Sequence, residues 1–241
     1  MTFWQCPGDA DQARLKAANS PHAGDWLNAL PIASVRLRLS DEEIRVAAGY
    51  HLGFFICQPH QCVCGSFIDA RGLHGLSCRK SAPRHVRHSL INDILRRAIK
   101  KAQVLACKEP VALSRSDGKR PDGATLIPWS HGKPLARDVT VPDTFVQSHI
   151  TSTATNASAA ADRAACSKKH EHLNITHNFI PFALESGGSW NSEAIELINK
   201  IGNRITAINS EPLVTIHDST DFNRSPERQC PGVPEHIPKW Q

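Results

Sequence analysis

The stretch DGKRPDGATLIPWSHGKPLARDVTVPD, residues 117–143, is the part around which the rest of the chain is organised. The basic pair Lys119 and Arg120 precedes a Pro-Asp-Gly sequence that contains Asp122, and Asp138 opens a short apolar run further on. Two acids placed in this way, one on a turn and one on the following strand, can meet at a hairpin. There they can hold a hard divalent cation, which prefers carboxylate oxygens. The stretch therefore predicts a metal-dependent nuclease centre, with a simple Pro-Asp-Gly turn as the alternative.

Composition limits what the chain can be. It has 241 residues, a net charge of +5 and eight cysteines. This length allows one good core, or one core with a small satellite module. The positive charge favours an anionic partner, and no apolar run is long enough to span a bilayer, so no membrane role is expected. The amino-terminal sequence MTFWQCPGDADQARLK lacks the pattern of a secretory signal. The cysteines are therefore expected to be reduced thiols or metal ligands, in a nuclear or cytoplasmic protein.

Hydrophobic periodicity predicts a small α/β layer structure with the order helix, three strands, helix, strand, helix. The first helix, residues 86–103, carries apolar residues at helical spacing on one face and basic residues on the other. The expected strands are residues 109–113, 124–127, 135–141 and 179–184, and the later helices run to about residue 173 and over residues 192–208. Three antiparallel strands and a crossover helix would lead into the fourth strand.

The chain divides into four predicted segments. Residues 1–50 form a helical lead-in, in which Ser40 and Glu43 have the spacing of a capping box at a helix start. Residues 51–83 form a Cys/His module, residues 84–210 the α/β domain, and residues 211–241 a proline-rich, irregular tail.

The Cys/His module contains CQPHQCVCGSFIDARGLHGLSC, residues 57–78. Cys62, Cys64, His74 and Cys78 offer three thiolates and an imidazole, which is enough for a closed tetrahedral zinc site. So small a segment, with few large apolar side chains, is expected to need the metal in order to fold. A single residue separates Cys62 from Cys64, which is short for such a site. Alternative ligands are therefore Cys57, His60, His85 and His88, and the competing interpretation is a set of ordinary buried thiols.

The nuclease interpretation requires further groups beside the two acids. Glu109, at the start of the first expected strand, is a candidate for a third oxygen ligand. In the simplest arrangement a lysine follows the second acid by two residues on the same strand face, but that residue is Thr140. Lys169 on the following helix is the substitute, against the alternative that Lys168 and Lys169 are a solvated pair.

Basic residues around the two acids predict a nucleic-acid surface. Arginine and lysine on one helix face can neutralise phosphates without reading base sequence. The candidates are Arg84, Arg87, His88, Arg96, Lys119 and Arg120. A solvated basic helix face is the alternative.

Taken together, these residues resemble the carboxyl-terminal region of non-LTR retrotransposon polyproteins, which carry a restriction-like endonuclease behind their reverse transcriptase. The resemblance covers about residues 13–208. Its most specific blocks, in order, are WLNALP, CVCG…GLHGLSC, RHVRHSLINDILRRAI, DGKRPDGATLIPW, DVTVPDT and FIPFALES. It implies a CCHC zinc knuckle followed by an endonuclease of the PD-(D/E)xK type, which nicks target DNA so that the freed 3′ hydroxyl primes reverse transcription.

By position, the resemblance implies that Asp122 and Asp138 hold a catalytic magnesium ion and that Lys169 is the lysine of a KxxKY pattern. Structural zinc and catalytic magnesium are the expected cofactors, and DNA the expected partner, with RNA as an alternative. No reverse transcriptase domain is expected within this chain.

The chain also departs from that family. Residues 166–170 read CSKKH, without the first lysine and the tyrosine of KxxKY, and Ala136-Arg137 stands where relatives tend to have an apolar-Trp pair. The family's glutamine- and arginine-rich ending and its polymerase domain are also missing. Together these departures predict a truncated or decaying copy that keeps its metal-binding acids and its fold but has reduced or no activity. The competing functions are a catalytically silent, zinc-containing module that binds nucleic acid, and a remnant that folds poorly.

Overall fold

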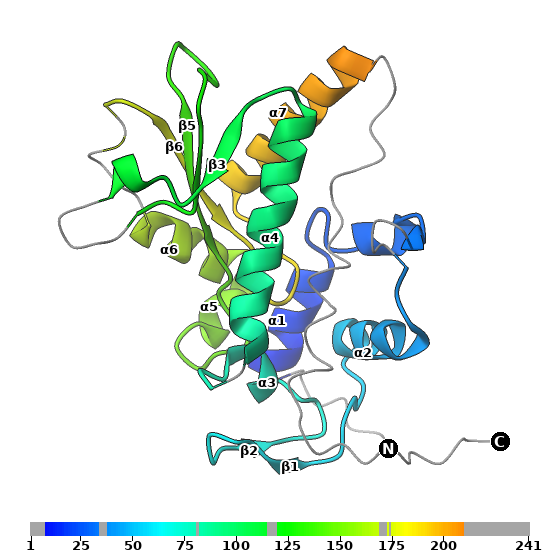
Figure 1. The fold of residues 1–241 in the computed structure, drawn as a ribbon. Helices are drawn as coiled ribbons and strands as arrows, with labels where there is room; N and C mark the ends of the chain where they lie inside the picture. Colours follow the sequence, from blue (N-terminus) through cyan, green and yellow to red (C-terminus); the bar gives the residue numbers. More distant parts are fainter. Residues whose placement is uncertain are drawn as a thin grey trace.

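A computed structural model describes residues 8–33, 38–80, 82–114, 120–168, 173 and 175–209. Over these residues the protein is a mixed α/β structure with seven α-helices, a four-stranded sheet and a two-stranded sheet (Figure 1). None of the described helices is long and apolar enough to cross a membrane. The predicted tail, residues 211–241, lies outside the described residues.

The α/β part follows the predicted order, except that two short helices occupy the place of the single crossover helix that was expected to run to about residue 173. The elements are α4 (Ala82–Lys101), β3 (Ala106–Lys108), β4 (Gly123–Thr125), β5 (Leu135–Thr140), α5 (Ile150–Thr155), α6 (Ala159–Ser167), β6 (Asn178–Ala183) and α7 (Ser192–Asn209). The sheet order is β3-β4-β5-β6. The first three strands are antiparallel, and β6 runs parallel to β5, since α5 and α6 return the chain to the starting edge.

Helices cover both faces of the sheet. Side chains alternate between the two faces along β5, so each face presents its own set of residues to a helix layer. Leu135 and Val139 face α4 and α7 and share a hydrophobic core with Leu95 and Leu197. On the other face, small residues let α6 approach closely, and Ala161 and Ala165 pack on Ala183 of β6. Asp138 is on this second face, where it is reached from α6.

One predicted strand is wrong. Residues 109–113 form no strand, and the edge strand β3 ends at Lys108. Glu109 has a positive φ of 44°, and Pro110 then leads into a 3-10 turn, η3 (Val111–Leu113). Proline cannot donate a ladder hydrogen bond and so is unsuited to the middle of a paired strand, which explains the early end of β3.

The amino-terminal segment and the Cys/His module come before this core. The lead-in consists of α1 (Asp9–Ala18), the 3-10 helix η1 (Asp25–Asn28) and α2 (Asp41–Leu52). The capping box at the start of α2 is confirmed, because the Ser40 side chain accepts from the Glu43 amide and the Glu43 carboxylate accepts from the Ser40 amide. The module contains the hairpin β1 (His60–Gln61) and β2 (Phe67–Ile68), then the short helix α3 (His74–Ser77).

Candidate functional site

The hairpin and α3 bring together the four predicted ligands of the Cys/His module. The ligand atoms of Cys62, Cys64, His74 and Cys78 all lie within 4.8 Å of one another, and this group can hold a metal ion. The Cys62 and Cys78 sulfurs are 3.6 Å apart, and Cys64 Sγ lies 3.1 Å from His74 Nε2. A tight turn supplies the first two ligands, since the Cys62 amide donates to Ser66 O at 2.8 Å.

The alternative ligands lie outside this group of four. Cys57 donates from its sulfur to the carbonyl of Asp69 at 3.3 Å, and His60 Nδ1 lies 2.7 Å from the carbonyl of Gln58. His85 is exposed on the first turns of α4, and His88 contacts Asp122 instead. Within the group, hydrogen bonds from Ser66 lower the pKa of Cys64 to about 6, whereas burial raises the pKa of Cys78. A lowered thiol pKa favours the thiolate, which is the form that binds metals.

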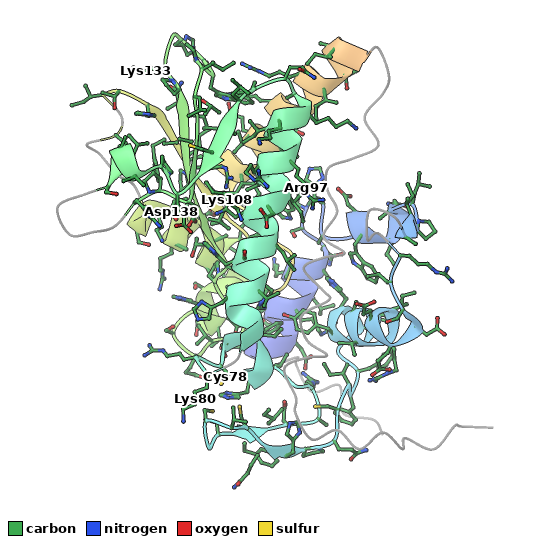
Figure 2. All side chains as sticks on the ribbon, in the orientation of Figure 1. Cys78, Lys80, Arg97, Lys108, Lys133 and Asp138 are labelled. Carbon is green, nitrogen blue, oxygen red and sulfur yellow. The ribbon has the colours of Figure 1, made fainter. Side chains whose placement is uncertain are left out.

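The second site is the carboxylate pair, Asp122 and Asp138. Asp122 immediately precedes β4 and Asp138 lies within β5, which is the neighbour of β4 in the sheet. The two carboxyl groups are close enough for each to shift the pKa of the other. Asp122 Oδ2 also accepts from the Val139 amide at 2.7 Å and lies 2.9 Å from His88 Nε2. Asp138 is only 6% exposed. Figure 2 labels its side chain on the sheet, beside α6. The two acids predicted to converge are therefore adjacent.

The surroundings shift the pKa values of the two acids in opposite directions. Burial alone would raise the pKa of Asp122, but hydrogen bonds with His88, Asp138 and the Val139 amide outweigh it and lower that pKa to about 2. Burial and the neighbouring Asp122 raise the pKa of Asp138. The hydrogen bond to Asp122 raises the pKa of His88. Two carboxylates this close repel each other when both are ionised, so a cation between them would lower their energy.

The ammonium group at this pair belongs to Lys168. Its Nζ lies 3.1 Å from Asp138 Oδ2. Lys168 forms the C-cap of α6, and its amide donates to Ala165 O at 3.1 Å, which fixes its main chain at the end of the helix. Lys169, the residue predicted from the KxxKY pattern, lies outside the described residues. The interpretation of Lys168 as a purely solvated side chain does not account for this contact.

Glu109 does not join the pair in this structure. Its side chain is 56% exposed and forms an ion pair with Arg120. Its amide donates to the carbonyl of Asp122 at 3.0 Å, so Glu109 is near the second site through its main chain only. Arg120, predicted to contact nucleic acid, is thus exposed but already paired with an acid.

The predicted nucleic-acid residues on α4 have different surroundings. Arg87 is only 2% exposed and donates to the carbonyl of Leu76 in α3, so it is not on the basic surface. Arg96 Nη2 is 3.7 Å from Asp93, and Lys108 Nζ is 2.7 Å from the same carboxylate. The side chain of Arg84 and the whole of Lys119 lie outside the described residues.

Sequence reasoning did not assign roles to Asn92 and Arg137. Arg137 is 1% exposed and donates from Nη2 to the Asn92 carbonyl at 3.2 Å, and burial lowers its pKa to about 10. Gly123 lies directly opposite, where a Cβ would come within 2.8 Å of the Arg137 guanidinium. Gly123 is the first residue of β4. Because it has no side chain, it leaves room for the Arg137 guanidinium. The spacing of His88 and Asn92, one helical turn apart, was the available clue that both face one site.

Glu185, also unassigned from sequence, anchors the amino end of α6. It is fully buried at 0% exposure, and its carboxylate accepts from the amides of Ala160 and Ala161 at 2.9 and 3.1 Å and from the Thr144 hydroxyl at 3.0 Å. Burial raises the pKa of Glu185, and the three hydrogen bonds oppose that rise. This carboxylate holds the helix whose other end presents Lys168.

We expect Glu185→Ala to lower the free energy of unfolding by about 3 kcal/mol, because it leaves three buried donors without an acceptor. Chemical denaturation followed by circular dichroism measures this change. The control is Glu196→Ala, at a side chain that is 64% exposed on α7, for which a change below about 0.5 kcal/mol is expected. Equal effects of the two substitutions would contradict the anchoring role.

No protein-family model matches the chain, and no curated protein matches it in sequence. What the fold and the sites define directly is a mixed α/β protein with a Cys/His cluster that can hold a metal ion.

Proposed function

We propose that residues 82–209 form a restriction-like endonuclease core that hydrolyses DNA phosphodiesters with a magnesium ion. The observation that carries this proposal is the proximity of Asp122 and Asp138: the Asp122 carboxylate accepts from the amide of Val139, the residue next to Asp138, and Lys168 Nζ lies 3.1 Å from Asp138. The order of helix, three antiparallel strands, crossover helices, parallel strand and helix is compatible with such a core.

The donor set suits a small, hard cation. Magnesium is commonly bound by one or two carboxylates, with water and substrate phosphate oxygens completing the shell. Asp122 Oδ2 is engaged by His88 and the Val139 amide, and these two contacts restrict the orientation of the carboxylate. Glu109 is not required for this arrangement, and its ion pair with Arg120 keeps its carboxylate on the surface.

The residues around the carboxylate pair have different proposed roles in the reaction. When bound, the cation supplies charge neutralisation and a more acidic water molecule. Asp122 and Asp138 hold and orient that cation. Lys168 places a positive charge beside them, where it can stabilise the negative charge that develops on the phosphate in the transition state. The net charge of +5 favours the approach of a polyanion.

We further propose that the metal of the Cys/His cluster is structural zinc. Three thiolates and one imidazole are a common structural zinc set, and a Zn–S bond of ~2.3 Å places two sulfurs about 3.8 Å apart in a tetrahedron. The Cys62 and Cys78 sulfurs, at 3.6 Å, are close to that separation. The cluster would then act as a knuckle that orders residues 57–78 and contributes to nucleic-acid binding.

The biological role proposed from the sequence resemblance is nicking of target DNA to prime reverse transcription by a retrotransposon-derived protein, in the nucleus or cytoplasm. A separate reverse transcriptase domain would supply the polymerase activity. The rival proposal is a catalytically silent module that binds nucleic acid. Its supporting observation is the altered CSKKH sequence at residues 166–170.

Incubation of the purified protein with supercoiled plasmid and Mg²⁺ tests the proposal. The expected result is conversion to the nicked circle that requires Mg²⁺ and is absent in Asp122→Ala. Equal nicking by both proteins would exclude the carboxylate pair as the catalytic site. Salt-dependent binding of DNA without any nicking would favour the silent module.

We expect Lys168→Ala to slow nicking by roughly tenfold to a hundredfold. This is less than the loss typical of a donor in a water-excluded site, because Lys168 has a 40% exposed side chain. Single-turnover nicking rates at saturating Mg²⁺ measure it. Lys169→Ala is the matched control, with the same charge change at the adjacent residue. A larger loss in Lys169→Ala than in Lys168→Ala would contradict the assignment.

A further inference from the structure

The first turns of α4 contact both of the sites described above. Figure 1 shows α4 running from α3, beside the β1–β2 hairpin, along the four-stranded sheet. Figure 2 places Cys78 at the foot of this helix and Asp138 on the sheet beside α6. Two neighbouring residues of α4, Arg87 and His88, make these contacts, one with each site.

Arg87 is directed toward the Cys/His cluster. Its guanidinium is buried and donates to the carbonyl of Leu76, which lies in α3 between the ligands His74 and Cys78. Leu76 and Cys78 are themselves only 6% and 4% exposed. The segment that supplies two of the four ligands is therefore fixed to the start of α4 by a buried, charge-assisted hydrogen bond, which is a strong type of contact.

His88 is directed toward the carboxylate pair. Its Nε2 lies 2.9 Å from Asp122 Oδ2, and Asn92, one turn further along α4, donates from Nδ2 to the Asp122 main-chain carbonyl at 3.2 Å. The helix thus holds both the side chain and the main chain of Asp122. A carboxylate that is fixed in this way loses little freedom when it binds a cation, and such supporting contacts raise metal affinity.

We propose that Arg87 and His88 are positioning residues that link the Cys/His cluster to the carboxylate pair, so that a metal-loaded cluster holds Asp122 in its cation-binding orientation. The cluster then supports the nuclease centre, in addition to any contact that it makes with nucleic acid. This inference rests on the proposed function, because it takes Asp122 and Asp138 as the cation site.

Rigid secondary structure would connect the Cys/His cluster to Asp122. Metal binding fixes α3, the Leu76 carbonyl fixes Arg87, and the helical backbone carries that position directly to the next residue, His88. Loss of the cluster metal would free α3 and thereby loosen the first turns of α4. Asp122 would then keep its contact with the Val139 amide. Its contacts with His88, at the carboxylate, and with Asn92, at the main-chain carbonyl, would become less ordered.

Titration of the zinc-loaded chain with Mn²⁺, followed by the EPR signal of free Mn²⁺, tests the link without measuring activity. We expect a dissociation constant at least about tenfold weaker in Arg87→Met and His88→Leu, the loss typical when a supporting partner of a metal ligand is removed. His88→Gln, whose amide nitrogen can replace Nε2 as the donor to Asp122, should recover most of the affinity. His85→Ala, at an exposed histidine of the same helix, is the control and should match the unchanged chain.

The outcomes separate this inference from the proposed function. If the unchanged chain and Asp122→Asn bind Mn²⁺ equally, the proposed cation site itself is wrong. If only Asp122→Asn loses affinity and Arg87→Met and His88→Leu match the unchanged chain, the link is overturned. If Arg87→Met does not fold, amide hydrogen exchange of Gly123–Thr125 in the zinc-stripped chain replaces it. Faster exchange on stripping supports the link, and unchanged exchange overturns it.

Discussion

Asp138→Asn is expected to reduce Mg²⁺-dependent nicking by more than about a thousandfold, exceeding the loss caused by removal of a single transition-state donor. The neutral amide cannot balance the charge of a divalent cation, and the contact with Lys168 is weakened at the same time. A time course of plasmid nicking at saturating Mg²⁺ measures this loss.

The same substitution should leave stability intact, which separates a catalytic defect from unfolding. The pKa of Asp138 is raised by burial and by Asp122, so the ionised side chain costs free energy in the folded state. That cost is present at neutral pH, where an unfolded aspartate is fully ionised, and it disappears when the charge is removed. The melting temperature of Asp138→Asn is therefore expected to equal or exceed that of the unchanged chain.

Asp93→Asn is the matched control. Asp93 is a more exposed acid on α4 that pairs with Lys108. Nicking by this variant should stay within a few-fold of the unchanged chain, because surface ion pairs contribute little. An equal loss of activity in Asp93→Asn and Asp138→Asn would mean that nicking depends on the net charge of the protein and not on the carboxylate pair.

Cys64→Ser is expected to abolish tight zinc binding and to unfold the Cys/His module. Structural zinc contributes an apparent ~10–16 kcal/mol in small zinc-finger peptides at neutral pH, and the module has little apolar core of its own to replace it. Metal analysis after dialysis, together with hydrogen exchange over residues 57–78, measures both effects.

Cys57→Ser provides the comparison, since Cys57 lies in the same module but outside the group of four ligand atoms. Its zinc content should equal that of the unchanged chain. Loss of zinc in Cys57→Ser with retention in Cys64→Ser would contradict the ligand assignment and favour one of the alternatives considered from the sequence.

The sequence predicted the long helices because their apolar stripes are regular. In α4 and α7 the buried residues Leu95, Ile99, Leu197 and Ile201 follow helical spacing, and tertiary packing agrees with that pattern. The edge strand β3 was displaced toward the carboxyl end in the prediction, because the apolar residues around Val111 have strand-like composition. Pro110 was the feature that should have excluded them.

The candidate sites could be predicted in part, to the extent that they depend on local spacing. The Cys/His cluster falls within one short segment, so its four members could be proposed from the density of possible ligands, although the one-residue gap between Cys62 and Cys64 left alternative ligands open. The choice between Lys168 and Lys169 depends on where α6 ends and how it lies on the sheet, which no local pattern specifies. The burial of Arg87 depends on the packing of α3 against α4, and this too is a tertiary property.

The most direct test of the central claim is a crystal structure of the protein soaked in Mn²⁺, with anomalous diffraction used to locate the ion. The predicted result is a peak within bonding distance of both Asp122 and Asp138 carboxylates, with Asp122 still in contact with His88. Ordered carboxylates at these positions with no manganese between them, in crystals that bind manganese elsewhere, would contradict the account.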